Sequence, residues 1–215
     1  MSHNTIGSLF GRKGSGKSTL VGEITRDFRR VIVIDYLGEY DARRGFTVHE
    51  GFTASATALV RWNPKPRFAL SLRVDEVHHA LMLLEIVWEM RNVLLVVEES
   101  SWLCTPSNLP QELRRLVRMG RHREISQLYV AQRPAMVHRD VTSQSDWIVS
   151  FQQHEARDIH FLEESLLGEQ AEKVRELGQY EIIAGTASGS PAQLPAAVRA
   201  RLRSSDRAKG VDDRH

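Results

Sequence analysis

The chain of 215 residues lacks most features of exported and membrane-bound proteins. It contains a single cysteine, Cys104, which excludes an internal disulfide and suits a reducing compartment. No apolar run approaches the roughly 20 residues that a membrane-spanning helix needs. A glycine-rich motif begins at residue 11, which leaves no room for a signal peptide before it. We therefore expect a cytoplasmic protein without an integral membrane segment.

A strong charge imbalance is also missing. The 29 Lys and Arg residues nearly balance the 27 Asp and Glu residues, so composition alone demands no polyanionic partner. The hydrophobic fraction of 41% is ordinary for a globular protein, and the length suits one domain with a substantial core. From residue 185 onward, large apolar residues become rare. We expect a domain over residues 1–184 and a flexible or partner-docking tail over residues 185–215.

The glycine-rich motif is a complete phosphate-binding loop. Gly11–Ser18 fits G-x-x-x-x-G-K-[ST] at every fixed position, between an apolar strand and a helix. Backbone N–H groups of such a loop form an anion cradle at the positive end of the helix. Lys17 would reach the β- and γ-phosphates of ATP, and the Ser18 hydroxyl would ligate Mg²⁺. The predicted nucleotide-binding residues are Gly11, Arg12, Lys13, Gly14, Ser15, Gly16, Lys17, Ser18 and Thr19.

Strand-like and helix-like segments alternate along the chain. This alternation predicts a mostly parallel sheet flanked by helices, and the phosphate loop makes it an α/β fold of the RecA-like P-loop NTPase type. We predict strands at residues 5–10, 31–34, 67–74, 93–97, 125–131, 147–151 and 180–184. We predict helices at residues 17–28, 54–60, 75–91 and 111–119, and one or two more within 155–177.

Two glutamates follow the most apolar predicted strand, Val93–Val97. Ligands of open α/β sheets bind at the carboxyl ends of the strands. Glu98 would therefore support Mg²⁺, and Glu99 would act as the base toward the attacking water. The alternative is that both glutamates merely begin a solvated loop.

Further polar residues extend this predicted site. Gln132 ends the next strand, where its amide would contact the γ-phosphate or the water; alternatively it is a capping or solvent-facing residue. Upstream lies a dense arginine run in which Arg114, Arg118 and Arg121 share one face at helical spacing. One of these arginines could act as an arginine finger across a subunit boundary, although such a run is usually a solvated face.

These pieces together resemble the HerA/FtsK superfamily of ring-forming, DNA-pumping ATPases. The resemblance covers roughly residues 5–152 and lies in Asp35-Tyr-Leu-Gly-Glu-Tyr40, Leu95-Val-Val-Glu-Glu99, Gly120-Arg-His-Arg-Glu-Ile125 and Ala131-Gln-Arg-Pro134. It implies that Lys17 and Ser18 hold phosphate and metal and that Glu98 and Glu99 form the Walker B motif. It also implies Gln132 as the sensor and Arg121 as the trans-acting finger. Two residues depart from the pattern: Glu124 replaces a glycine and Ala131 a threonine.

The chain resembles, within that superfamily, the genome-packaging ATPases of membrane-containing icosahedral viruses. We see no amino-terminal barrel, membrane region or winged helix beside the motor domain. The resemblance implies a ring, expected to be a hexamer, that threads double-stranded DNA into a preformed capsid and contacts capsid or portal-vertex proteins. Two groups of basic residues are candidates for phosphate contacts in a channel: Arg61, Lys65, Arg67 and Arg73, and Arg114, Arg115 and Arg118.

Other functions fit the same motifs. One is a cellular HerA-like translocase in repair or plasmid transfer. Another is a nucleotide-dependent phage assembly or secretion factor similar to the zonula-occludens-toxin-like proteins. A third is a nucleotide-binding scaffold that does not hydrolyse ATP. Asp35 and Glu39 either touch the nucleotide site or a subunit boundary, or Glu39 and Tyr40 organise the loop after the second strand.

Overall fold

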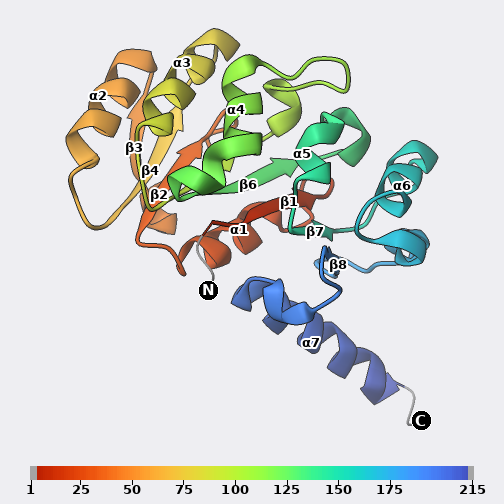
Figure 1. Cartoon of the computed structure of the whole chain (residues 1–215). Coiled ribbons are helices and arrows are strands. Elements are labelled where there is room, and N and C mark those ends of the chain that lie inside the picture. The colour runs from red at the N-terminus through yellow and green to blue at the C-terminus, as the bar shows by residue number, and fades with distance from the viewer. Residues whose placement is uncertain (1–3, 213–215) are drawn as a thin grey trace.

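A single eight-stranded sheet organises the chain (Figure 1). The computed structural model describes the backbone of residues 4–212 and the side chains of residues 4–204. The strand order is β3-β4-β2-β5-β6-β1-β7-β8, with all pairs parallel except β7 and β8. The strands are β1 (Ile6–Phe10), β2 (Arg30–Ile34), β3 (Thr47–Glu50), β4 (Phe68–Arg73), β5 (Val93–Val97), β6 (Ile125–Ala131), β7 (Trp147–Ser150) and β8 (Ile183–Thr186).

Helices cover both faces of this sheet, with α2, α3 and α4 on one side and α1 and α7 on the other (Figure 1). They are α1 (Lys17–Thr25), α2 (Phe52–Trp62), α3 (Val77–Trp88), α4 (Gln111–Met119), α5 (Arg139–Ser143), α6 (Ala156–Glu163) and α7 (Ala196–Asp212). Shorter 3₁₀ turns join them. Within residues 4–212, no helix combines the length and the apolar character that crossing a bilayer requires.

The central strands are buried on both faces because their residues alternate between two cores. In β2, Ile32 and Ile34 pack with α2, α3 and α4, whereas Val31 and Val33 pack with α1. All five residues of β5 are buried. Continuous β-branched and leucine-rich runs of this kind are typical of parallel strands between two helical layers. The alternation fixes the register, and therefore fixes which residues lie at the carboxyl ends of the strands.

Several elements differ from those that the sequence predicts, and helices α5 and α7 are among those not predicted. β3 was not predicted, because its Thr47-Val-His-Glu50 residues lie at the sheet edge and none is buried. The predicted strand 180–184 begins later, at Ile183, so Tyr180 lies outside the sheet. The predicted helix or helices over 155–177 are α6 and a separate 3₁₀ segment, Gly168–Arg175.

Residues 185–204, which the composition led us to expect in a flexible or docking tail, are packed against the domain. Thr186 belongs to β8, and Leu194 and Val198 are buried in the core beneath α1. Ala197 and Leu202 of α7 also pack against this core, although the segment as a whole is small and polar. A docking role for this segment stays a prediction, and the side chains of residues 205–215 lie outside those the structure describes.

Candidate nucleotide-binding and active site

The phosphate loop connects β1 to α1 and has the backbone shape that its glycines allow. Gly14 has φ 80° and Gly16 has φ 100°, a left-handed conformation that other residues adopt only at a cost. Gly16 stands at the start of α1, so the first N–H groups of the helix face the loop. This geometry can cradle an anion, as the sequence pattern predicts.

Lys17 lies inside this loop. Its Nζ donates to the Gly11 carbonyl at 2.7 Å and to the Arg12 carbonyl at 3.2 Å, and only 8% of the residue is exposed. Burial lowers the pKa of Lys17, while the carboxylates of Glu98, Glu99 and Glu39 act in the opposite direction. The ammonium group is therefore held beside the cradle and surrounded by negative charge, where a phosphate group would compete for it.

Glu98 is a buried carboxyl at the end of β5. The Tyr40 hydroxyl donates to its Oε2 at 2.9 Å. Burial raises the pKa of Glu98 to about 7, and the hydrogen bond from Tyr40 only partly offsets that effect. The pKa of Tyr40 is raised well above its ordinary value, chiefly by burial, so the phenol stays a donor.

The loop after β2 brings the Glu39 carboxylate into the site. The Asp35 carboxylate accepts the backbone N–H groups of Glu39 and Tyr40 at 2.9 and 3.0 Å, and the Ser71 hydroxyl at 2.8 Å. This loop is thereby folded back so that the Ser18 hydroxyl hydrogen-bonds to the Glu39 carboxylate. The structure shows Glu39 in contact with the phosphate loop, and the loop itself is organised by Asp35 through the backbone N–H groups of Glu39 and Tyr40.

Glu99 and Gln132 meet at the same edge of the sheet. The Gln132 Nε2 donates to Glu99 Oε2 at 3.1 Å, and the Ser101 hydroxyl donates to Glu99 Oε1 at 2.6 Å. Glu99 has φ 46°, a strained conformation for a non-glycine residue. Strain of this kind persists only where surrounding contacts enforce it, and the hydrogen bonds from Gln132 and Ser101 are such contacts.

The oxygen-rich set around Ser18 fits a magnesium ion in its chemistry. Mg²⁺ prefers hydroxyl, carboxylate and water oxygens, and is held by one or two carboxylates together with the phosphates of a nucleotide. Ser18 and Glu98 are the predicted ligands. Glu39 was not among them, and its contact with the Ser18 hydroxyl adds it to the candidates.

Arg121 lies at the opposite edge of the sheet. It precedes β6 in a 3₁₀ turn (Gly120–Arg123), where it donates to the Gln144 carbonyl at 2.6 Å and pairs with Asp146 at 3.0 Å. Gln132 follows the other end of β6, whose seven residues at about 3.3 Å each separate the two by roughly 20 Å. Within one chain, the structure therefore does not bring Arg121 together with the other predicted site residues.

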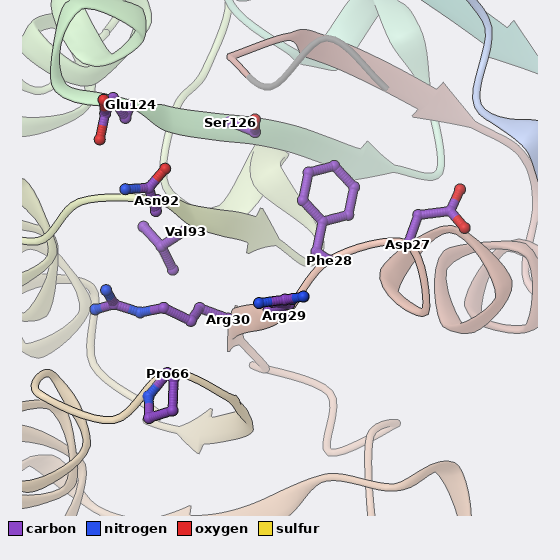
Figure 2. Close-up of a pocket in the computed structure, with 9 residues that line it drawn as sticks. All are labelled: Asp27, Phe28, Arg29, Arg30, Pro66, Asn92, Val93, Glu124 and Ser126. Carbon is purple, nitrogen blue, oxygen red and sulfur yellow. The ribbon is translucent and has the colours of Figure 1, made fainter.

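A cavity of about 500 Å³ opens at this same edge, far from the phosphate loop. Its lining residues come from the starts of β2, β5 and β6, the segments before them, and the turn before β4 (Figure 2). They are Asp27, Phe28, Arg29, Arg30, Pro66, Asn92, Val93, Glu124 and Ser126. Acidic and basic groups are mixed in this lining, and none of its residues belongs to the Gly11–Ser18 loop.

The first group of basic residues proposed for DNA contact is split by β4. Arg67 precedes this strand, whereas Arg73 ends it at the nucleotide edge. Arg73 pairs with Glu50 at 3.1 Å and donates to the Gly38 carbonyl at 3.2 Å, so it supports the loop that carries Glu39. In the second group, Arg118 is 60% exposed and pairs with Asp140 at 2.9 Å.

Known proteins resemble this chain in structure rather than in sequence. No protein-family model matches it, and no curated protein does. The genome packaging NTPase B204 from Sulfolobus turreted icosahedral virus 2, in complex with sulfate, superposes with a TM-score of 0.72 at 18% identity, covering 88% of this chain and 95% of that one. Its complex with ATP-gammaS gives 0.71 at 20% identity, covering 88% and 96%. VirB4 of Thermoanaerobacter pseudethanolicus gives 0.58 at 12% identity, covering 87% and 90%.

These likenesses confirm the predicted fold. The chain has the mixed α/β architecture of the P-loop NTPases, with an eight-stranded, mostly parallel sheet flanked by helices. Its structural neighbours include a viral genome packaging NTPase, the conjugation coupling protein TcpA and VirB4.

Proposed function

We propose that this chain is an ATPase whose hydrolysis drives movement of double-stranded DNA, and that it packages a viral genome into a preformed capsid. One observation carries the proposal: Lys17, Ser18, Glu98, Glu99 and Gln132 gather at one edge of a sheet whose fold is that of a packaging NTPase. The protein would work in the host cytoplasm and at the capsid.

The residues of this edge divide the chemistry among them. Lys17 would leave the Gly11 carbonyl and neutralise the γ-phosphate. Ser18 and Glu98 would hold Mg²⁺, which supplies charge neutralisation when it is bound. Glu99 would accept a proton from the attacking water while Gln132, already hydrogen-bonded to it, orients that water or contacts the γ-phosphate.

A neighbouring copy would complete the site. Arg121 is the finger residue by motif, and its position supports action only on the nucleotide of another subunit. Contacts of this head-to-tail kind close into rings. We propose a homo-oligomeric ring, a hexamer by analogy with the superfamily, with double-stranded DNA in its channel and a capsid or portal-vertex protein as the docking partner.

The test is ATPase activity of the full chain with and without double-stranded DNA, alongside mass determination with bound nucleotide. We expect an oligomer whose turnover rises with DNA, and a Lys17→Ala variant that releases no phosphate. Turnover that ignores DNA would favour an assembly or secretion factor. Absence of any phosphate release would leave a nucleotide-binding scaffold and overturn the proposal.

A further inference from the structure

A second cavity, of about 550 Å³, adjoins the phosphate loop. On one side it is lined by Gly16 and Thr19, at the start of α1. On the other side are the segment Gln179–Glu181 and two residues of α7, Arg201 and Ser204. Its volume lies within the range of small-molecule sites. No sequence pattern predicts this cavity, because its two sides are 160 or more residues apart along the chain.

Tyr180 forms one wall of this cavity. A Cβ placed on Gly16 would lie 2.9 Å from the Tyr180 Cδ1, so the ring rests directly against the phosphate loop. Yet 54% of Tyr180 remains exposed, and its φ of 69° is rare for an aromatic residue. An exposed, flat aromatic surface held in a strained backbone beside an anion cradle is a feature that packing alone does not require.

Polar groups surround the remainder of the cavity. Arg201 reaches the loop, with its Nη1 3.5 Å from the same Gly16 position, and it pairs with Glu23 of α1 at 3.3 Å. Thr19 is exposed, one residue after the predicted magnesium ligand Ser18. Gln179 is also exposed, and its side-chain amide can both donate and accept hydrogen bonds. The cavity thus offers an aromatic face with hydrogen-bonding groups around it.

We propose that this cavity binds the base and ribose of a purine nucleoside triphosphate whose phosphates lie in the Gly11–Ser18 loop. The purine stacks on Tyr180, the Gln179 amide faces the polar edge of the base, and the ribose passes over Thr19. This assignment rests on the proposed nucleotide-binding function and deepens it. The packing of residues 194–204 against α1 places Arg201 at the same cavity.

Equilibrium binding to the full chain tests the assignment without depending on turnover. A non-hydrolysable ATP analogue, the corresponding CTP analogue and inorganic tripolyphosphate, each with Mg²⁺, are titrated calorimetrically into four proteins: wild type, Tyr180→Ala, Tyr180→Phe and Lys17→Ala. Tripolyphosphate reports on the phosphate loop alone, because it has no base. Tyr180→Phe is the matched control, because it keeps the ring and removes only the hydroxyl.

We expect Tyr180→Ala to weaken binding of the ATP analogue about tenfold, as loss of one base–aromatic stack does. It should lower the preference for ATP over CTP and leave tripolyphosphate binding unchanged, while Tyr180→Phe behaves as wild type. Unchanged ATP binding in Tyr180→Ala would overturn the assignment, as would equal weakening of ATP and tripolyphosphate. If instead the proposed nucleotide-binding function is wrong, Lys17→Ala should bind the ATP analogue and tripolyphosphate as wild type does.

Discussion

The two edges of the sheet hold their charged groups differently. At the carboxyl edge, Asp35 and Glu98 are fully or almost fully buried, and the carboxylates of Glu98, Glu99 and Glu39 act on the buried Lys17. At the amino edge, the Arg121 side chain is 40% exposed and pairs with Asp146, and a cavity at the same edge has Asp27, Arg29, Arg30 and Glu124 in its lining. The carboxyl edge buries a group of carboxylates near Lys17, whereas the amino edge holds acidic and basic groups that are exposed or half-buried.

The separation of Arg121 from the carboxyl edge supports our proposal that one chain holds only part of a phosphoryl-transfer site. Binding of a triphosphate and activation of water need the carboxyl edge alone, but charge that develops on the transferred group needs a further cation. No arginine from the amino edge can reach it across the sheet of its own chain. If the amino edge of one copy faces the carboxyl edge of the next, Arg121 of the first copy supplies the missing cation. Hydrolysis then depends on assembly.

Removing the arginine of the amino edge should have the largest effect on turnover. We expect Arg121→Ala to lower the rate of ATP hydrolysis by a factor of about 10³–10⁵, the range found for arginine fingers. Nucleotide affinity of the isolated chain should not change. Steady-state ATPase rates and equilibrium titration measure the two quantities. Arg139→Ala is the control, since it removes another half-exposed arginine with a surface partner, Glu164. Full turnover in Arg121→Ala would remove the finger assignment.

Removing the base at the carboxyl edge should cost somewhat less. Glu99→Gln keeps the shape of the side chain and a carbonyl oxygen for Gln132, but cannot accept the proton of water. We expect turnover to fall by about 10²–10⁴, the contribution of a positioned general base, with ATP binding retained. The exposed Glu163→Gln substitution controls for loss of a carboxylate elsewhere. Wild-type turnover in Glu99→Gln would show that another group activates the water.

The burial of Glu98 predicts a pH-dependent stability. Its pKa is raised from 4.5 to about 7, so between these values the folded chain keeps a proton that the unfolded chain has lost. The free energy of unfolding should therefore fall as pH rises through this window, by up to about 3 kcal/mol, and level off above it. Urea titrations without nucleotide, from about pH 5 to about pH 8, measure this slope. Glu98→Gln should flatten it, and an unchanged slope would assign it to other groups.

The smallest predicted effect concerns the second strained glutamate. Glu124, at the amino edge, has φ 59° and an exposed side chain, and it stands where related motifs have glycine. Because glycine adopts this conformation without strain, Glu124→Gly should raise the free energy of unfolding by up to about 1 kcal/mol and leave turnover unchanged. Glu124→Ala, which keeps the strain, is the control in the same urea titration. Destabilisation by glycine would show that the Glu124 side chain itself supports this edge.

Much of the nucleotide edge follows from the sequence for a simple reason. Buried β-branched runs such as Val93–Val97 identify central parallel strands, and the residues that follow them must meet at one edge. Lys17, Glu98, Glu99 and Gln132 could be placed in this way. Arg121 precedes its strand, so the same rule places it at the far edge.

Contacts between distant segments could not be predicted from these patterns. The hydrogen bond from Tyr40 to Glu98 joins residues 58 positions apart, and the contact of Tyr180 with Gly16 depends on how the chain returns after β7. The edge strand β3 has no buried residue to reveal it. Helix α7 has few large apolar residues, and the burial of Leu194 and Val198 depends on α1 being present beside them.

The shared site is tested most directly by mixing two inactive variants. In a random one-to-one mixture of Arg121→Ala and Glu99→Gln chains, about a quarter of the head-to-tail interfaces pair an intact carboxyl edge with an intact amino edge. We predict that the mixed oligomers recover a corresponding share of the DNA-stimulated ATPase activity, although neither variant is active alone. Mixed oligomers that hydrolyse no more ATP than the separate variants would contradict a site built from two chains.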